Sequence, residues 1–352
     1  MTFTETFDLA PGYRISRVIR GGWQLAGDHG AVTRETVSDD LAAFYDAGIT
    51  TFDCADIYTG VEAMIGDFRA DLRNRRGAEA LAALRVHTKF VPDLELLPRL
   101  TGADVRRIVD RSLQRLRMER LDLVQFHWWD YDQPRYVEAA LHLKDLQAEG
   151  KIAHVSGTNF DVAHVAEIAA AGVPFTTLQV QYSLLDRRPE GALTALCAQL
   201  GTRLLCYGSL AGGFLTDAWL GRPEPAGPIA NRSLVKYKLI IDDFGGWALF
   251  QTLLQTLRRV ADRHETTIAA IAARHVLDRP LVAAVIVGAS HPRHLPDTLR
   301  IGTTRLTDAD RAEIAAVLTQ ANGPNGEVYA LERDRTGRHG SIMKYNLGDA
   351  KP

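Results

Sequence analysis

The sequence predicts a (β/α)8 barrel, also called a TIM barrel, because eight short strand-like runs alternate with helical patterns over its 352 residues. Most of these runs are almost continuously apolar, which is typical of parallel strands buried on both faces. The alternative is a doubly wound open sheet, but no GxGxxG motif follows the first run. We therefore expect one barrel domain over residues 1–352, with its core at about 12–320.

The elements follow in a regular order. The first twenty residues predict a β-hairpin around the turn sequence "APG". Helical patterns lie between the barrel strands, for example at 33–48, 101–118 and 134–151. Thr101 with Asp104 suggests a capping box, and Gly48 and Gly150 mark helix ends. The barrel strands are predicted at 18–22, 50–53, 86–89, 121–127, 152–157, 175–180, 203–207 and 282–287.

Two segments exceed what a barrel requires. After the seventh strand, residues 210–246 are rich in Gly and Pro and then basic at Lys236 and Lys238, which predicts a long functional loop. After Asn322, a C-terminal tail at 323–352 carries several charges and two tyrosines. This tail could cover the mouth of the barrel.

The composition is that of an ordinary globular protein, with 46% hydrophobic and 24% charged residues and a formal net charge of −2. This charge gives no reason to expect nucleic acid or an anionic membrane as a partner. Cys54, Cys197 and Cys206 lie far apart without metal spacing, which favours a reducing compartment over a disulfide framework. Neither a signal peptide nor a transmembrane run is apparent, so we expect a cytoplasmic location.

Polar residues end three successive strands of the predicted barrel. Asp53, Lys89 and His127 follow one another at intervals of one β/α unit, and Tyr58 lies in the loop after Asp53. The carboxyl ends of all strands in such a barrel open onto one face, where active sites lie. Alone, such an aspartate is more often a turn residue, and a histidine beside two tryptophans is more often a core residue. The regular spacing favours one shared site.

These residue types suit the protonation of an oxygen that gains negative charge. A tyrosine is a weak acid with a pKa near ~10, and a nearby lysine ammonium lowers that value. A buried lysine needs a counter-charge, which Asp53 supplies, and His127 can donate a hydrogen bond to a substrate oxygen. A carbonyl that receives a hydride needs such a site. A metal-dependent hydrolase would instead need a cluster of His, Asp and Glu at strand ends, and only Asp53 and His127 qualify.

These segments resemble the aldo-keto reductase superfamily. "GITTFDCADIYTGVEAMIG", "HTKF" and "FHWWD" match its catalytic motifs, and "SGTNF", "LQVQYSLLDRR", "LLCYGSLAGGFLT" and "VIVGASHPRHLPDTL" follow in the same order over about residues 12–320. The resemblance implies a barrel oxidoreductase that reduces an aldehyde or ketone to an alcohol, or the reverse. It further implies NADP(H), less often NAD(H), as the cofactor, no metal, and a catalytic tetrad of Asp53, Tyr58, Lys89 and His127.

The resemblance also implies residues for the cofactor. Asn159 and Gln179 would bind the nicotinamide carboxamide, and Tyr207 would stack on the ring. Taken alone, Asn159 could be a turn residue and Tyr207 a core aromatic. Residues 213–245 would fold over the pyrophosphate. The complete set implied for the cofactor is Gly22, Thr158, Asn159, Gln179, Tyr207, Gly208, Ser209, Leu210, Gly212, Gly288, Ser290, Arg293, His294 and Thr298.

The sequence departs from the family pattern at four positions. Thr59 stands where a glycine usually follows the tyrosine, and Cys54 stands where Thr or Ser usually follows the aspartate. In the segment that would hold the adenosine phosphate, His294 replaces Arg or Gln, and Thr298 replaces Asn. Arg293 is adjacent and can substitute as a cation, so we expect NADP(H) to be preferred.

The substrate is predicted only as a small carbonyl or alcohol compound. Trp23 and Trp128 lie at or just beyond strand ends and are expected to wall its pocket, because aromatic walls suit flat rings or sugar faces. Trp129 could instead pack under a helix. The physiological direction and the oligomeric state stay open. A redox sensor or partner subunit that binds the cofactor with little turnover is the alternative, against which the intact tetrad argues.

Overall fold

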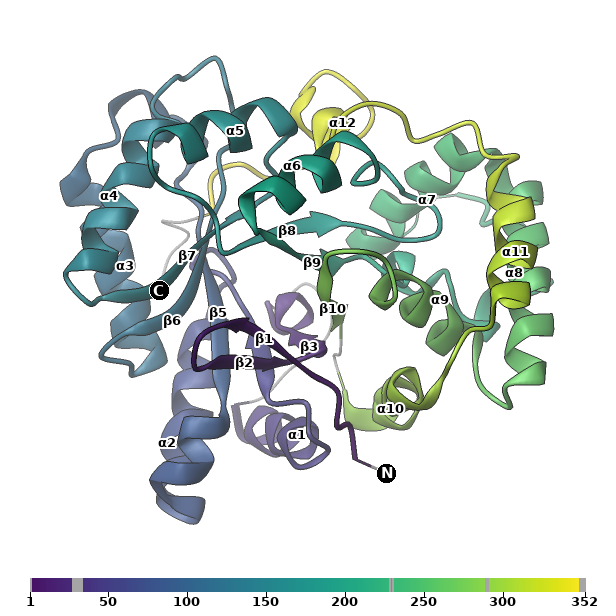
Figure 1. Cartoon of the computed structure of the whole chain (residues 1–352), viewed down its shortest axis with the longest axis horizontal. Coiled ribbons are helices and arrows are strands. Elements are labelled where there is room, and N and C mark those ends of the chain that lie inside the picture. Colours follow the sequence, from purple (N-terminus) through teal and green to yellow (C-terminus); the bar gives the residue numbers. More distant parts are fainter. Residues whose placement is uncertain (1, 27–33, 228, 230, 289–290, 348–352) are drawn as a thin grey trace.

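Eight parallel strands close into a barrel in this computed structural model, with helices around them (Figure 1). The structure describes residues 2–26, 34–227, 229, 231–288 and 291–347. The order of strands around the barrel is β10-β3-β4-β5-β6-β7-β8-β9, which confirms the predicted fold class. Their bounds are β3 Val18–Gly21, β4 Thr51–Asp53, β5 Arg85–Phe90, β6 Leu121–Phe126, β7 Ile152–Thr158, β8 Thr177–Gln181, β9 Arg203–Tyr207 and β10 Val282–Gly288.

Each predicted strand overlaps one of these strands, with ends that differ by no more than two residues, and two of these differences bear on the site. Gly22 and His127 lie just beyond β3 and β6, because pairing with the neighbouring strand stops at Gly21 and at Phe126. Both residues therefore belong to the loops at the carboxyl end of the barrel. These loops are where a barrel places its functional groups.

A hairpin fills the end of the barrel where the strands begin. The strands β1 Thr6–Ala10 and β2 Tyr13–Ser16 pair antiparallel, as predicted, and Gly12 takes a φ of +73° in the turn between them. The side chains of Tyr13 and Ile15 are buried against inward-facing residues of the barrel, among them Leu123. This packing leaves the opposite end of the barrel for a site.

Helices cover the outside of the barrel (Figure 1). The capping box of Thr101 and Asp104 is present at the start of α3, and Gly48 and Gly150 take φ values of +87° and +84°, as expected at helix ends. The helices up to the seventh barrel strand are α1 Arg34–Asp46, α2 Val61–Ala83, α3 Gly102–Leu116, α4 Tyr136–Ala148, α5 Val162–Ala170 and α6 Ala192–Leu200. Those that follow are α7 Arg232–Phe244, α8 Gly246–Arg263, α9 Ile268–Leu277, α10 Leu295–Thr303, α11 Asp308–Leu318 and α12 Ala330–Arg333.

The long connection after β9 is not all loop, because its second half forms α7. Asn231 caps this helix by accepting hydrogen bonds from the backbone N–H groups of Ser233 and Leu234. Buried residues recur at helical spacing at Tyr237 and Phe244, with Ile240 and Ile241 between them. The sequence predicted a loop over the whole connection because its first half is rich in Gly and Pro, although the second half has the periodicity of a helix.

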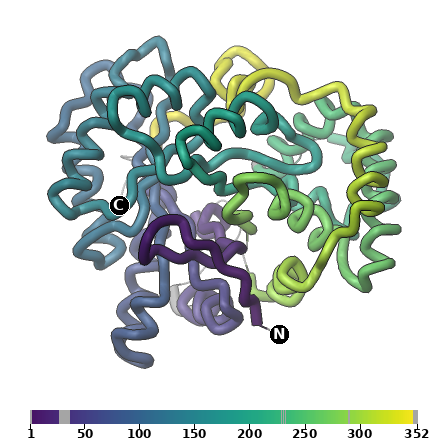
Figure 2. The backbone as a smooth tube through the Cα atoms, viewed as in Figure 1, coloured from purple at the N-terminus to yellow at the C-terminus, as the bar shows by residue number. Residues whose placement is uncertain are grey.

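The C-terminal segment returns from α11 across the molecule towards α4 and α5 (Figure 2). It is held there by hydrogen bonds from the Arg333 guanidinium to the carbonyl oxygens of Trp128 and Asn159 and to the Tyr131 hydroxyl. The predicted tail therefore lies against the loops at the carboxyl end of the barrel.

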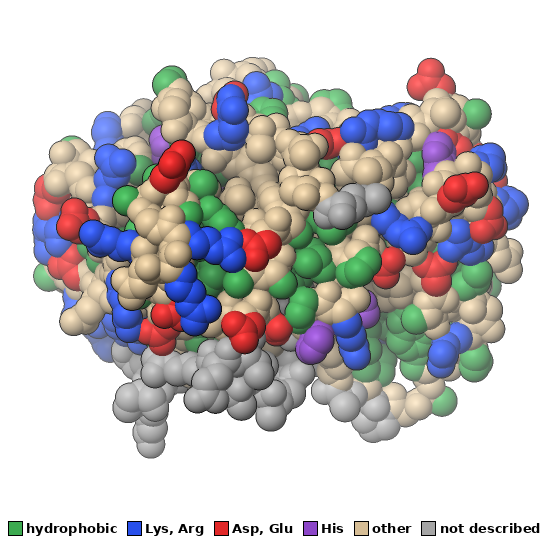
Figure 3. All heavy atoms as spheres, turned by 90° about the horizontal axis from the view of Figure 1, so that it is seen from below, with side chains coloured by type: hydrophobic (Ala, Val, Ile, Leu, Met, Phe, Trp, Pro, Cys, Tyr) green, Lys and Arg blue, Asp and Glu red, His purple; other side chains and the backbone are tan. Residues whose placement is uncertain are grey.

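The surface seen from below carries acidic and basic side chains that are interspersed (Figure 3). Within the described ranges, no helix has the length and apolar character needed to cross a membrane. Among the same residues, no group of three or more His, Cys, Asp or Glu side chains is placed to hold a metal ion.

Candidate active site

A cavity of about 930 Å³ lies at the carboxyl ends of the barrel strands. Asp53, Tyr58, Lys89 and His127 all line it, so the structure brings the four predicted catalytic residues together. Its size falls within the usual range for ligand pockets.

A buried ion pair lies at the base of this cavity. The Lys89 Nζ atom lies 2.5 Å from Asp53 Oδ1 and donates a second hydrogen bond to the Cys54 carbonyl oxygen at 2.8 Å. Asp53 is the last residue of β4 and pairs with His87 on β5. Lys89 lies two residues after His87, and residues two apart on a strand point to the same side. The side chains of Asp53 and Lys89 therefore both point into the barrel. Burial disfavours the ammonium, but the charge and hydrogen bond of Asp53 together with the nearby Tyr58 outweigh it and raise the pKa of Lys89 to about 12.

Two glutamines complete the environment of Asp53. Asp53 Oδ2 accepts hydrogen bonds from Gln125 Nε2 at 2.7 Å and from Gln179 Nε2 at 2.8 Å. Gln179 lines the cavity as predicted, but its amide also donates to Gln125 Oε1, so here it orients Asp53. Gln125 was missed by the sequence analysis. The sequence did indicate its position, because side chains two residues apart on a strand point to the same side, and Gln125 comes two residues before His127.

Tyr58 is held above this ion pair by a tight turn. Its backbone N–H donates to the Ala55 carbonyl, and Gly60, the N-cap residue before α2, takes a φ of +78°, which explains a glycine one position later than in the family pattern. The Lys89 Nζ atom lies 5.2 Å from the centre of the Tyr58 ring, and the Trp23 ring lies 5.0 Å away, edge to face. Burial raises the pKa of Tyr58, whereas the Lys89 charge lowers it. The net effect is a raised pKa, contrary to the lowering expected from Lys89 alone.

His127 takes part through one ring nitrogen. Its Nδ1 atom lies 3.2 Å from the carbonyl oxygen of Thr158, which can only accept, so Nδ1 carries the proton of the neutral ring. Burial and the charge of Arg333 lower the pKa of His127 to about 3, so the ring is neutral at pH 7. Nε2 is then an acceptor, and it is buried without a partner among the described residues. The expected donation to a substrate carbonyl does not fit this tautomer.

Most residues expected to bind the cofactor also line the cavity. Tyr207 at the end of β9 donates from its hydroxyl to Asn159 Oδ1 at 2.9 Å, which fixes both side chains across the barrel end. The predicted cofactor residues that line the cavity are Gly22, Thr158, Asn159, Gln179, Tyr207, Gly208, Ser209, Leu210, Gly212, Gly288, His294 and Thr298. Arg293 is exposed and does not line it, although its Nε donates to His294 Nε2 at 3.0 Å. Ser290 lies outside the described residues.

The backbone beside Tyr207 has the features of a cofactor cradle. The Ser209 hydroxyl is buried, and no described residue forms a hydrogen bond with it. A Cβ atom at Gly208 would lie 2.3 Å from the Tyr237 hydroxyl oxygen, and one at Gly22 would lie 2.8 Å from the Asp53 carbonyl oxygen. Gly208 and the unsatisfied hydroxyl of Ser209 after β9 fit the close approach of a phosphate group.

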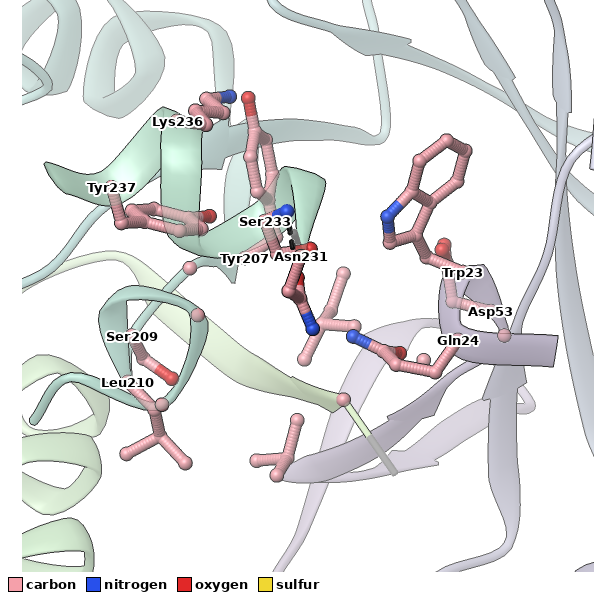
Figure 4. Close-up of a pocket in the computed structure, with 18 of the residues that line it drawn as sticks. Trp23, Gln24, Asp53, Tyr207, Ser209, Leu210, Asn231, Ser233, Lys236 and Tyr237 are labelled. Atoms are coloured by element: carbon pink, nitrogen blue, oxygen red, sulfur yellow. Dashed lines mark hydrogen bonds between the residues drawn. The ribbon is translucent and has the colours of Figure 1, made fainter. Parts of the chain in front are cut away.

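Figure 4 shows this wall from inside the cavity. Trp23 and Tyr207 stand on different sides of the space, and Lys236 and Tyr237 project from α7 next to Tyr207. Lys236 was not assigned to the site from the sequence. It reaches the cavity through the packing of α7, for which the local sequence carries no signal.

Of the neighbouring residues Trp128 and Trp129, it is Trp129 that lines the cavity and Trp128 that packs in the protein interior. Trp128 is fully buried, its ring packs near Phe126, and its Nε1 donates to the Gln133 carbonyl oxygen at 2.9 Å. The prediction of Trp128 as a pocket wall is therefore wrong, and Trp129 lines the cavity instead. In the loop after β6, the Trp128 ring packs against Phe126 and Tyr136, whereas His127 and Trp129 line the cavity. Trp23 lines the cavity as expected.

The tail supplies lining residues that the sequence did not single out. The Tyr329 ring centre lies 5.4 Å from that of His127, and the Tyr345 ring packs 5.2 Å from Trp129. Tyr329, Ile342, Met343, Lys344 and Leu347 line the cavity. The tail thus forms part of the end of the cavity that surrounds Tyr58 and His127.

Comparison with known proteins agrees with this geometry. The model of the "Aldo/keto reductase family" matches residues 17–319. The chain belongs to this family. Two relatives are the "NADH-specific methylglyoxal reductase" of Escherichia coli (strain K12), 26% identical over 84% of this chain and 92% of its own length, and "Aldo-keto reductase YhdN" of Bacillus subtilis (strain 168), 26% identical over 90% and 94%.

A solved structure shares the fold of this aldo/keto reductase. The glycerol dehydrogenase AKR11B4 from Gluconobacter oxydans matches with a TM-score of 0.76 and 24% identity, over 91% of this chain and 97% of that one. Family membership makes the chain an NAD(P)-dependent oxidoreductase that acts on carbonyl or alcohol groups.

Proposed function

We propose that this chain reduces an aldehyde or ketone at the cavity described above, with Tyr58 as the general acid. The observation that supports this proposal is the arrangement of Tyr58 beside the ammonium of Lys89, which is itself held by Asp53. A carbonyl oxygen that becomes an alkoxide needs a proton donor within reach. Tyr58 is the hydroxyl donor that faces the cavity next to this ion pair.

The bound nicotinamide cofactor would supply the hydride. Tyr207 and Asn159 would hold its ring end, and Ser209 with the glycines around it would hold its phosphates. Lys89 would stabilise the phenolate that Tyr58 becomes after giving up its proton, and Asp53 would keep Lys89 charged and in place. His127 would accept a hydrogen bond at Nε2 from the hydroxyl group that forms, which orients the product side of the reaction.

The protonation state of Tyr58 fits this role. Because burial raises the pKa of Tyr58, the phenol is protonated at neutral pH and ready to donate. In the reverse reaction the same group would have to be a phenolate, so oxidation of the alcohol should speed up as the pH rises towards this pKa. Reduction should stay nearly flat over the same range.

We also propose that NADP(H) is preferred over NAD(H). Arg293 is exposed beside His294, which lines the cavity, so a 2′-phosphate there would meet a guanidinium. Fluorescence titration at low salt measures both dissociation constants. Replacing Arg293 and His294 together by Ala should reduce the difference in binding free energy between NADPH and NADH by about 1–3 kcal/mol. Equal constants for the two cofactors in the parent protein would defeat this part of the proposal.

The function itself is tested with purified protein, saturating cofactor and a panel of aldehydes and ketones, followed by the absorbance of the reduced nicotinamide. The panel should include methylglyoxal, after the relative named above, and aromatic aldehydes, because Trp23 and Trp129 line the cavity. Turnover that is lost in Tyr58→Phe supports the proposal. Tight cofactor binding without turnover on any member would favour the redox-sensor alternative.

A further inference from the structure

A lysine that the proposed reaction does not use faces the same cavity. Lys236 projects from α7 into the cavity lining, and its Nζ atom lies 5.3 Å from the ring centre of Tyr207 (Figure 4). The rings of Tyr237 and Tyr329 lie at 5.7 Å each. Three tyrosine rings thus lie around one ammonium group and favour its charged form, against burial, which lowers the pKa of Lys236.

The carboxylate nearest to this ammonium is already occupied by another cation. Glu332 of the tail lies 3.7 Å from Lys236 Nζ, which is beyond hydrogen-bond distance. Both oxygens of Glu332 accept hydrogen bonds from the Arg188 guanidinium, at 3.1 and 3.2 Å. Glu332 therefore attracts Lys236 by charge from beyond hydrogen-bond distance, and Lys236 itself lines the cavity.

The position of Lys236 relative to the reacting groups suits a substrate. The Tyr329 ring is a neighbour of both, because its centre lies 5.7 Å from Lys236 Nζ and 5.4 Å from the centre of the His127 ring. A flat molecule of one aromatic ring could therefore have its carbonyl group near Tyr58 and His127 and its far end near Lys236. Trp23 and Trp129 also line this cavity and supply aromatic walls for such a ring.

The charges of the lining residues differ along the cavity. The acidic lining residues among the described parts of the chain are Asp53, Asp217 and Asp297. Asp53 is engaged by Lys89, and Asp217 is engaged by the Ile268 N–H and by Arg258. Asp297 lies on α10 beside Thr298, at the predicted adenosine end. The acidic residue beside Lys236 is therefore Glu332, which does not line the cavity and is bonded to Arg188.

We propose that Lys236 binds a carboxylate carried by the substrate, so that the preferred substrates are carbonyl compounds with a carboxylate at their far end. This inference rests on the proposed reductase function and narrows its substrate class. A charge-assisted hydrogen bond to a carboxylate is stronger than a neutral one, which gives the acid an advantage over its uncharged ester.

The test compares two aldehydes of nearly the same shape, 4-carboxybenzaldehyde and methyl 4-formylbenzoate, at saturating cofactor. We expect kcat/KM for the acid to exceed that for the ester by about tenfold or more, the ratio that one such bond supplies. In Lys236→Met this advantage should disappear through a higher KM for the acid, while the values for the ester stay within about twofold. Lys236→Arg keeps the positive charge and should therefore keep most of the advantage of the acid over the ester in kcat/KM.

A matched control lies on the same helix. Lys238 pairs with Asp242 and Glu224 and does not line the cavity, so Lys238→Met removes a lysine of α7 without touching the proposed contact. It should leave the ratio between acid and ester unchanged. Cofactor affinity, measured by fluorescence titration in each variant, shows whether Lys236 serves the cofactor instead.

The outcomes are distinct. Equal kcat/KM for the acid and the ester in the parent protein overturns this inference but leaves the proposed function intact. A loss of cofactor affinity in Lys236→Met that accounts for the whole rate effect also overturns it. Failure to reduce any carbonyl compound defeats the proposed function, and this inference with it.

Discussion

Removing Lys89 tests whether the ion pair at the base of the cavity acts as one unit. Lys89→Met leaves a side chain of similar length but takes away the charge that faces Asp53. The two side chains are only 7% and 5% exposed, and their closest atoms lie 2.5 Å apart. The substitution therefore leaves a buried carboxylate without its cation.

The cost follows from what remains around Asp53. Breaking one partner of a buried pair typically costs about 3–5 kcal/mol of stability. Gln125 and Gln179 still donate to Asp53 in the variant, so we expect about 3 kcal/mol, at the low end of that range. Asp53→Asn should cost a similar amount, because it leaves the ammonium with the Cys54 carbonyl. The double variant should cost less than the sum by about 1–3 kcal/mol, since neither charge is then left alone.

The assay is urea unfolding at pH 7, followed by tryptophan fluorescence, for the parent, both single variants and the double variant. A control cycle on the pair Arg106–Glu149, whose side chains are 43% and 42% exposed, should show about 1 kcal/mol or less for each change. Strictly additive costs at Asp53 and Lys89 would refute the reasoning. Turnover should be lost in both buried single variants.

Two further predictions concern the segments that close the cavity. Amide hydrogen exchange in α7 should slow when NADPH binds, because Lys236 and Tyr237 line the cavity; equal exchange with and without NADPH would exclude a covering role for this helix. Although burial disfavours its carboxylate, the charges of Lys236 and Arg188 lower the pKa of Glu332 to about 2 from an ordinary 4.5. Its contribution to stability is therefore complete above pH 4.5 and lost as the pH falls towards 2. In Glu332→Gln, the free energy of unfolding should depend less on pH between 4.5 and 2. An unchanged pH dependence in this variant would contradict a lowered pKa of Glu332.

The sequence predicted the barrel and the convergence of Asp53, Lys89 and His127 because both depend on local patterns. Apolar runs of strand length repeat with helices between them, and a barrel turns that repeat into one face of strand ends. The inward position of Gln125 could also have been predicted, because it lies two residues before His127, which the sequence places at the end of the same strand. The choice between Trp128 and Trp129 does not follow from strand alternation, because β6 ends at Phe126 and both tryptophans lie in the loop after it.

Other parts of the site depend on contacts between distant segments. Tyr329 reaches His127, and Lys236 reaches Glu332, only because the tail returns across the barrel end. No period within the tail or within the long connection encodes these contacts. The pKa of Tyr58 likewise depends on how deeply it is buried, which residue types alone do not give.

The central claim is that Tyr58 donates the proton to the carbonyl oxygen. Tyr58→Phe removes the phenolic oxygen and keeps the ring that packs against Trp23. The most direct measurement is the single-turnover rate of hydride transfer from bound NADPH to the best aldehyde of the panel, in the parent and in this variant. We predict a rate lowered by about 10²–10⁴-fold, the usual contribution of a general acid, with cofactor affinity unchanged. A rate within a few fold of the parent would show that another group supplies the proton.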